Sequence, residues 1–208
     1  FTNLTNGSGY SNRYRTESYL GRVRYDYQEK YNVEASFRRD GSSRFSKDSR
    51  WGNFGSIGAS WVITKENFMK PITWVNNLKL RADYGLVGND AGADYYAYMA
   101  LYSANQNNNK GAYYLSQLAN TNLKWETGAS FGIGLDARLF NRWNIGIEYF
   151  DKRNKDLLFD VYLPLSAGAT SSNDAEATIT ENMGTISNRG FEINTDIDIF
   201  KNKDWTVN

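Results

Sequence analysis

The sequence predicts an all-β chain whose long antiparallel strands form a segment of a transmembrane β-barrel. Three observations support this fold: polar and apolar residues alternate over long stretches, no amphipathic helix of useful length could cover an apolar sheet face, and short connections alternate with long ones. Alternation with period two is typical of a strand with one apolar and one polar face. We expect about seven long strands, with short turns at one end of the sheet and long loops at the other.

The clearest alternation runs from Trp125 to Leu139, where apolar residues occupy odd positions and Gly, Ser or charged residues occupy even ones. Further stretches with this pattern cover residues 31–38, 78–86 and 191–199, with weaker copies at 19–27, 57–63 and 143–149. A membrane strand needs about 9–11 residues, whereas a typical globular strand has about 5 or 6. We therefore expect membrane-spanning strands, and we expect the stretch 123–140 to project beyond the bilayer on the long-loop side.

The connections between these strands fall into two length classes. Short turns are expected at 28–30, 141–142 and 201–204, and long connections at about 40–53, 87–122 and 155–184. Residues 65–69 predict a single helical turn that Pro71 ends, because proline cannot continue a helix. Aromatic pairs flank the short turns, as expected for a girdle at a membrane interface: Tyr27 with Tyr31, Phe140 with Trp143, and Phe200 with Trp205.

The polar faces of the predicted strands carry charges of both signs. Arg22, Arg24 and Asp26 share one face, as do Lys79, Arg81 and Asp83. Opposite charges on neighbouring strands pair across a sheet, so a structural role is the default expectation for these residues in a watery lumen. Gly132 and Gly134 are expected to leave room in that lumen.

Composition excludes several classes of function. With 24 Lys+Arg against 23 Asp+Glu, nothing favours a nucleic-acid partner. The absence of Cys excludes thiolate metal sites, and the absence of His excludes Ser-His-Asp catalysis and His-bound zinc. A mean hydropathy of −0.64 and the lack of an apolar run near 20 residues exclude a helical membrane protein. Composition does not exclude enzymes whose catalytic groups are carboxylates alone. We nevertheless expect no catalytic residues, no cofactor and no metal.

Several motifs follow one another in an order that resembles the SusC/RagA-type TonB-dependent outer-membrane transporters of Bacteroidetes. The resemblance rests on the segments 38–45, 50–56, 77–81, 84–85, 88–89, 122–126, 149–150, 155–158, 182–184 and 188–192. The chain departs from the family pattern at Gly55, where proline is frequent, and at Asp83, where a small residue is usual.

The resemblance implies that residues 1–208 are a partial TonB-dependent receptor β-barrel domain, with the plug domain absent from this stretch. It implies about seven or eight strands of a larger barrel, with short periplasmic turns and long extracellular loops. It also implies an outer-membrane location and TonB-dependent import of oligosaccharides or peptides. The implied partners are a SusD-like lipoprotein, TonB (through an N-terminal part missing here), a glycan or peptide ligand, and the lipid bilayer. The alternative function is a structural or adhesive outer-membrane module whose long loops bind a partner.

Four loop residues are the candidate substrate-binding residues: Arg44, Trp51, Asn89 and Asp90. Aromatic faces stack on sugar rings, and paired polar groups bind hydroxyls or peptide backbone. The competing interpretation is that Arg44 and Trp51 hold the 40–53 loop against its neighbours. The stretch 89–94 also has oxygen ligands suited to calcium, but it lacks full ligand spacing, so an Asx-rich turn is favoured. Two glycosylation-type patterns at Asn3 and Asn6 are attributed to chance.

Overall fold

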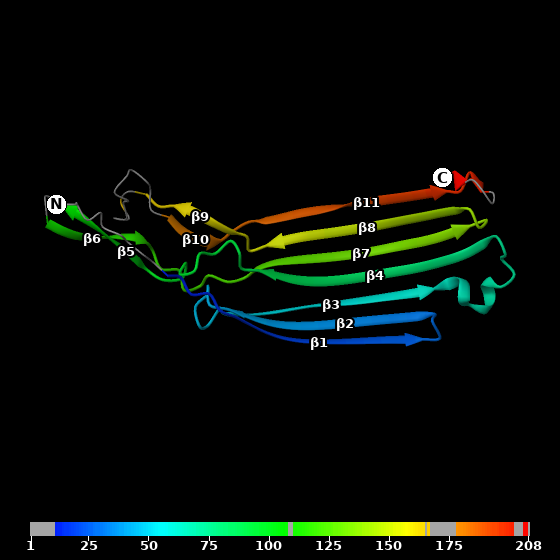
Figure 1. Cartoon of the computed structure of the whole chain (residues 1–208), viewed down its shortest axis with the longest axis horizontal. Helices are drawn as coiled ribbons and strands as arrows, with labels where there is room; N and C mark the ends of the chain where they lie inside the picture. Colours follow the sequence, from blue (N-terminus) through cyan, green and yellow to red (C-terminus); the bar gives the residue numbers. More distant parts are fainter. Residues whose placement is uncertain (1–10, 108–109, 165, 167–177, 202–205, 208) are drawn as a thin grey trace, which may run out of the picture.

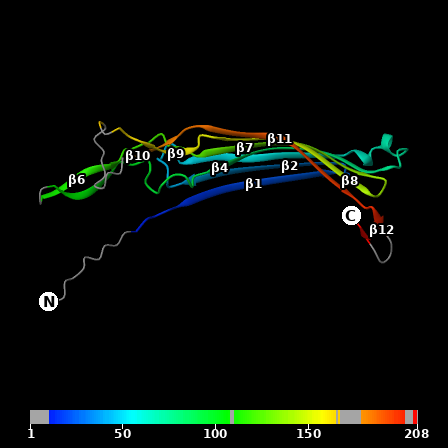
Figure 2. The same ribbon diagram turned by 90° about the horizontal axis from the view of Figure 1, so that it is seen from above.

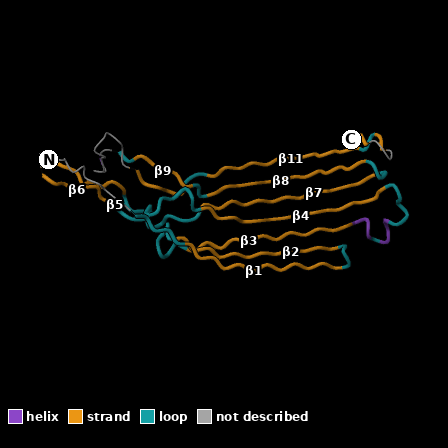
Figure 3. The backbone as a smooth tube through the Cα atoms, in the orientation of Figure 1, coloured by secondary structure: helices purple, strands orange, loops and turns teal. Residues whose placement is uncertain are grey.

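The computed structural model describes residues 11–107, 110–164, 166, 178–201 and 206–207. Seven long strands form one sheet in the order β1-β2-β3-β4-β7-β8-β11, and every neighbouring pair is antiparallel (Figures 1 and 3). The strands are β1 (Thr16–Tyr27), β2 (Tyr31–Ser42), β3 (Trp51–Val62), β4 (Val75–Asn89), β7 (Glu126–Leu139), β8 (Trp143–Lys155) and β11 (Thr185–Ile197). The prediction of an all-β antiparallel fold is confirmed.

The seven-stranded sheet is a single curved layer with two open edges (Figure 2). β1 forms one edge and β11 the other, so the barrel is not closed within the described residues. The strands are 12 to 15 residues long, which exceeds the length that a membrane strand requires. Each strand is therefore long enough to span a bilayer and to continue beyond it.

Short and long connections lie at opposite ends of the sheet (Figure 1). The turns after β1 and β7 and the link between β3 and β4 lie at one end. At the other end the long connections contain a second sheet of order β5-β6-β10-β9, formed by β5 (Leu101–Asn107), β6 (Lys110–Gln117), β9 (Leu158–Tyr162) and β10 (Thr178–Asn182). Sequence reasoning missed these four strands, because they are short and lack a long run of alternation.

The hairpin turns follow from backbone sterics. Gln28 and Glu29 have φ values of 54° and 53°, and Phe140 and Asn141 have φ values of 54° and 57°. Positive φ at both central residues is the geometry of a type I′ turn, which Lys30 N and Arg142 N close by donating to Tyr27 O and Leu139 O. Three residues separate the paired strand ends in each hairpin. The turn at 28–30 is confirmed, and the second turn includes the predicted residues 141–142 and begins one residue earlier, at Phe140. Residues 202–205, which hold most of the predicted third turn, and the patterns at Asn3 and Asn6 lie outside the described residues.

The link between β3 and β4 holds two 3₁₀ turns, η1 (Ile63–Lys65) and η2 (Asn67–Met69), in place of the single helical turn predicted. Hydrogen bonding continues past Pro71, since Ile72 N donates to Met69 O at 2.9 Å. A further short pair, β12 (Phe200–Lys201) and β13 (Thr206–Val207), follows β11. Among the residues described, no helix is both long enough and apolar enough to cross a membrane.

The two faces of the large sheet differ as the alternation predicts. Large apolar side chains on one face are solvent-exposed in this chain, among them Tyr25, Val33, Ile57, Ile133, Ile147 and Ile193. Such a row of apolar side chains is what a lipid-facing barrel surface requires. The opposite face carries most of the charged residues of the sheet, and the register places opposite charges on neighbouring strands, as with Arg24 on β1 and Glu34 on β2.

The buried core lies at the long-loop end, beyond the lipid-facing part of the sheet. Phe45, Ala93, Ala97 and Leu123 form it, and Trp125 packs against them. Two expectations are therefore corrected: β7 begins at Glu126 instead of Trp125, and Leu123 lies in a compact loop cluster instead of a projecting strand. The physical reason is that burial of the Leu123 and Trp125 side chains stabilises the fold more than two further cross-strand residue pairs would.

Aromatic residues gather near the short connections. Tyr31 stacks on Trp61 with ring centroids 6.2 Å apart, and it lies 6.4 Å from Tyr27. Phe140 and Trp143 flank the turn between β7 and β8, as expected. Phe140 stacks on Trp74 at 5.6 Å, and the Trp143 indole N–H donates to Thr195 Oγ1 at 2.7 Å. The Phe200 side chain and Trp205 lie outside the described part of the structure.

Candidate functional site

Arg81 joins three strands across the polar face. Alternation in β4 places it on this face, where its Nε lies 3.1 Å from Asp136 Oδ2 on β7. Its second terminal nitrogen lies 2.7 Å from Glu148 Oε2 on β8. The expectation that the mixed charges pair across strands is confirmed here, and also by Arg22 and Glu34, which are 2.7 Å apart. Such partly exposed pairs contribute little stability each, but they fix the positions of the charges.

Gly132 and Gly134 of β7 leave the space that the charged side chains of β4 occupy. A Cβ on Gly134 would lie 2.9 Å from the Arg81 guanidinium carbon, and a Cβ on Gly132 would lie 2.9 Å from Asp83 Oδ1. Both distances are shorter than ordinary van der Waals contact, so a larger residue would displace the charged groups. The expectation that these glycines leave room on the lumen side is confirmed.

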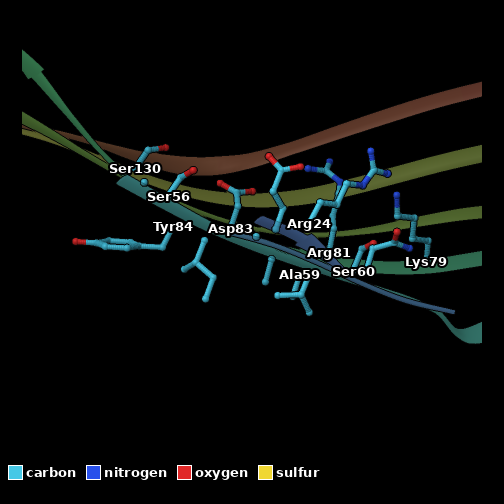
Figure 4. Close-up of a pocket in the computed structure, with 16 residues that line it drawn as sticks. Arg24, Ser56, Ala59, Ser60, Lys79, Arg81, Asp83, Tyr84 and Ser130 are labelled. Carbon is cyan, nitrogen blue, oxygen red and sulfur yellow. The ribbon is translucent and has the colours of Figure 1, made fainter. Parts of the chain in front are cut away.

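A hollow of about 610 Å³ extends over β2, β3 and β4 on the polar face. Figure 4 shows Arg24, Ser56, Asp83, Arg81 and Ser130 on one side of the sheet, whereas Tyr84 and Ala59 lie on the other. The polar side of the hollow therefore combines cations, a carboxylate and hydroxyls. This mixture suits a hydrated polar solute better than an apolar one.

Asp90 lies at the long-loop end of the polar face, where a second hollow of about 400 Å³ begins. Its Oδ2 accepts hydrogen bonds from Ser42 Oγ at 2.6 Å and from Tyr14 Oη at 2.8 Å. Burial raises the pKa of Tyr14, and the hydrogen bond to the Asp90 carboxylate raises it further. The phenol therefore stays protonated and remains a donor at neutral pH.

Arg44 holds the backbone around Asp90. Its guanidinium donates to the Asp90 carbonyl oxygen at 2.8 Å and lies over the rings of Tyr14 and Tyr95, at 4.8 and 5.2 Å from their centroids. Cation–π contacts of this geometry stabilise by roughly 0.5–2 kcal/mol. Arg44 thus connects the turn after β2 to the segment after β4.

Asn89 uses both ends of its amide to shape the same segment. Its Nδ2 donates to Glu126 Oε2 at 2.6 Å, and its Oδ1 accepts from Ala91 N at 3.1 Å, as in an Asx turn. The other oxygen of Glu126 accepts from Leu158 N at 2.8 Å. The Asx-rich turn is confirmed, and within the described residues no group of three or more His, Cys, Asp or Glu residues could hold a metal ion.

Trp51 lies on the other face of the sheet from Asp90. It pairs with Gly41, stacks on Tyr19 at 6.1 Å, and has the Arg39 guanidinium 5.2 Å from its ring. The structure therefore brings Arg44, Asn89 and Asp90 together and leaves Trp51 apart from them.

Sequence reasoning did not single out the aromatic residues that hold the loop cluster together. Trp125 packs against Phe45 at 5.4 Å and Phe54 at 5.5 Å, and its indole N–H donates to Arg50 O at 2.9 Å. The Phe54 ring occupies space next to Gly88, where a Cβ would lie 2.0 Å away. Phe54 breaks the alternation, since it is a large apolar residue at an even position of β3, and this break is the signal that could have identified it.

Comparisons with known proteins agree with this geometry. The family model "TonB dependent receptor-like, beta-barrel" matches residues 1–208. TonB-dependent receptor P39 of Formosa agariphila is 38% identical over 197 residues, which cover 91% of this chain and 18% of the relative. TonB-dependent receptor SusC of Bacteroides thetaiotaomicron is 35% identical over 211 residues, covering 98% of this chain and 20% of the relative.

Among solved structures, the RagAB peptide importer in its "closed-closed" state matches with a TM-score of 0.79 and 28% identity, covering 93% of this chain and 21% of that one. The chain spans about a fifth of the length of the curated relatives that it matches.

Proposed function

The chain belongs to the family of TonB-dependent receptor β-barrels, and we propose that it forms part of the wall of an outer-membrane nutrient importer. Proteins of this family lie in the outer membrane, and the family consists of receptors and transporters, not enzymes. The observation that carries the proposal is the contrast between the two faces of one uncovered sheet. One face presents apolar side chains such as Ile133 and Ile193, and the other presents the pairs formed by Arg81.

This contrast fits a wall between lipid and a watery lumen. Charged groups are costly to transfer into hydrocarbon, whereas apolar side chains there need no second protein layer. In a soluble sheet of this size, the apolar face would need a packed layer of helices or strands.

Cysteine labelling tests the assignment of the two faces. These 208 residues contain no Cys, so Ser60→Cys on the polar face and Ile133→Cys on the apolar face each add one thiol to this stretch, in a full-length background from which any other Cys has been replaced. In the full-length protein in membranes, a membrane-impermeant maleimide is expected to modify position 60 and to leave position 133 unmodified. Equal modification at both positions would rule out the wall assignment.

We further propose that residues 1–208 supply one sector of a larger barrel, with the plug domain and the TonB-contacting segment elsewhere in the protein. The two open edges, β1 and β11, support this, because strands that continue the sheet would pair with them. The alternative function, an adhesive or structural module, requires a unit near this length that folds by itself. The open sheet and the length of the relatives favour the importer.

For the substrate, we propose an oligosaccharide or a peptide, taken up together with a SusD-like lipoprotein. The resemblance to SusC and to a peptide importer supports this class, and the mixed charges of the 610 Å³ hollow suit polar solutes. We propose no catalytic step for this chain, since its charged residues lie spread along strands and pair with one another.

The candidate contacts stay Arg44, Trp51, Asn89 and Asp90, with Asp90 favoured because it lines the second hollow. Asp90→Asn keeps the shape of the side chain and removes its charge. If Asp90 binds substrate, this change lowers affinity by roughly tenfold or more, since a hydrogen bond to a charged group contributes about 1.5–3 kcal/mol. Binding is measured by calorimetry with peptide and oligosaccharide probes.

Asn89→Ala and Trp51→Ala serve as comparisons in the same assay, with thermal unfolding measured in parallel. Weaker binding at unchanged stability indicates contact with substrate. Lower stability at unchanged affinity indicates that the residue only holds its loop, which is the outcome expected for Trp51 from its contacts with Tyr19 and Arg39.

A further inference from the structure

The apolar face of the large sheet changes character near its long-loop end. A hollow of about 440 Å³ lies there, and its lining includes Tyr84, Phe131 and Tyr149 together with Asp151, Arg153 and Lys155. One part of this hollow is therefore aromatic and the other part is charged. Neither the loop cluster nor the polar face explains a charged group of residues at this place.

The register orders these residues along the strands. Ile133 pairs with Tyr149, Phe131 with Asp151, and Ala129 with Arg153, so all of them share the apolar face. On the next strand, Arg189 pairs with Asp151. Toward the long loops, the face changes from aromatic to charged within two residues on β8, from Tyr149 to Asp151, and on β11, from Phe191 to Arg189.

The change occurs at the height where the hydrocarbon layer ends. Arg153 follows Trp143, which lies next to the short turn, by ten residues along β8. With a rise of about 3.4 Å per residue and a strand tilt of about 40°, this separation gives a height of about 26 Å. The apolar band of an outer-membrane barrel is about 25 Å tall, so Arg153 and Lys155 lie at the headgroup level of the outer leaflet.

The charged residues that line the hollow and Arg189, which pairs with Asp151 beside it, together have an excess of cations. Asp151 is already paired with Arg153, through contacts of 2.9 Å and 2.6 Å to the guanidinium. Lys155 and Arg189 form no ion pair with any residue that the structure describes, and Arg153, Lys155, Arg189 and Asp151 together carry a net charge of +2. Cations at a membrane surface are stabilised by anionic headgroups, by about 1 kcal/mol for each Lys or Arg.

We propose that this hollow binds a phosphate-bearing lipid of the outer leaflet, with the phosphate at Lys155, Arg189 and Arg153 and an acyl chain along Phe131, Tyr149 and Tyr84. The proposal rests on the membrane orientation given under the proposed function. Two features favour a lipid over a soluble anion. The aromatic residues of the hollow are continuous with the lipid-facing surface, and the charged residues lie only on the long-loop side of these aromatic residues.

Selectivity for a phosphate headgroup tests the site in the full-length protein. The protein is reconstituted in phosphatidylcholine bilayers that contain spin-labelled phosphatidic acid or spin-labelled phosphatidylcholine, and the fraction of immobilised label is measured. We expect the wild type to prefer phosphatidic acid. Absence of a preference in the wild type would by itself overturn the proposal.

The decisive variant is Lys155→Gln with Arg189→Gln, because it removes two cations and leaves the pair of Asp151 and Arg153 intact. Its preference is expected to fall by about tenfold or more. The matched control is Lys79→Gln with Lys152→Gln, which removes two cations from the polar face and should leave the preference unchanged. An equal loss in both variants would overturn the proposal, because it would reflect total charge only.

Two further measurements separate the possible explanations. Displacement of the label by millimolar inorganic phosphate would contradict a lipid site, since it would indicate a general anion site. If headgroup preference is absent while positions 60 and 133 keep their labelling pattern, the lipid site fails and the importer assignment stands.

Discussion

At the short-turn end of the sheet, three side chains surround the carboxylate of Glu66. Glu66 accepts hydrogen bonds from Tyr31 Oη at 2.7 Å, from Lys30 Nζ at 3.3 Å and from Trp61 Nε1 at 3.3 Å. The hydrogen bond from Tyr31 lowers the pKa of Glu66, and those from Trp61 and Lys30 lower it further. The cluster ties the link after β3 to the aromatic residues near the membrane boundary.

Glu66 is expected to make stability depend on acid pH. A carboxyl whose folded-state pKa is lowered stabilises the fold above its unfolded value, near 4.5, and this contribution disappears as pH falls through the lowered folded value. Glu66→Gln should therefore unfold at a lower temperature than the wild type at pH 7, with a difference that shrinks below about pH 4.5. Thermal unfolding of the full-length protein at several pH values measures this.

Glu29→Gln is the matched control, because Glu29 pairs with Lys65 at the same end of the molecule but its side chain is 81% exposed. Exposed pairs contribute little stability, so the control should unfold like the wild type at each pH. A pH-independent loss in Glu66→Gln would argue against the role of its charge.

Among the elements, the connections at the long-loop end differ from simple loops because they share a core. Phe45 and Leu123 are fully buried there. Ser46 Oγ donates to Thr121 O at 2.8 Å, and Asn182 Nδ2 donates to Lys124 O at the same distance. These contacts join the connection after β2 to those after β4 and β8.

Phe45→Ala is expected to loosen this cluster without disturbing the sheet. Truncation of a buried Phe costs about 3–5 kcal/mol, partly through the cavity that it leaves. We expect faster proteolytic cleavage near residues 43–50 in intact cells or vesicles, with the barrel still resistant. Phe68→Ala is the control, since Phe68 is 59% exposed and lies in the short link, and it should leave the cleavage rate unchanged. Equal cleavage of wild type and Phe45→Ala would show that the core does not order the loops.

At the scale of the whole molecule, the sheet separates two solvents. The apolar face matches lipid and the polar face matches water, so a given substitution has opposite consequences on the two faces. Ile133 and Ser130 are close neighbours on β7 that belong to different faces.

Ile133→Lys is expected to destabilise the full-length barrel by about 2–4 kcal/mol, because it places a charge near the middle of the bilayer. Ser130→Lys places the same charge on the polar face and should cost much less. Urea unfolding in lipid vesicles compares the two variants. A larger loss for Ser130→Lys would reverse the assignment of the faces.

The sequence alone determined the strands of the large sheet, their two faces and the ends at which turns and long connections lie. Period-two alternation is local, so residues 78–86 and 191–199 reveal their faces without knowledge of any partner strand. It could not reveal β5, β6, β9 and β10, because these strands are short and depend on contacts between distant segments.

The candidate site was only partly predictable for the same reason. Motif and residue type selected Arg44, Asn89 and Asp90 as candidates. Their arrangement in space depends on the hydrogen bonds of Asp90 with Ser42 and Tyr14 and of Asn89 with Glu126, and these partners are distant from Asp90 and Asn89 in the sequence. The side of the sheet on which Trp51 lies was decided by the extension of β3 as far as Trp51, because alternate residues of one strand share a face. Only the tertiary structure decided these points, because each depends on contacts and strand boundaries that no local pattern encodes.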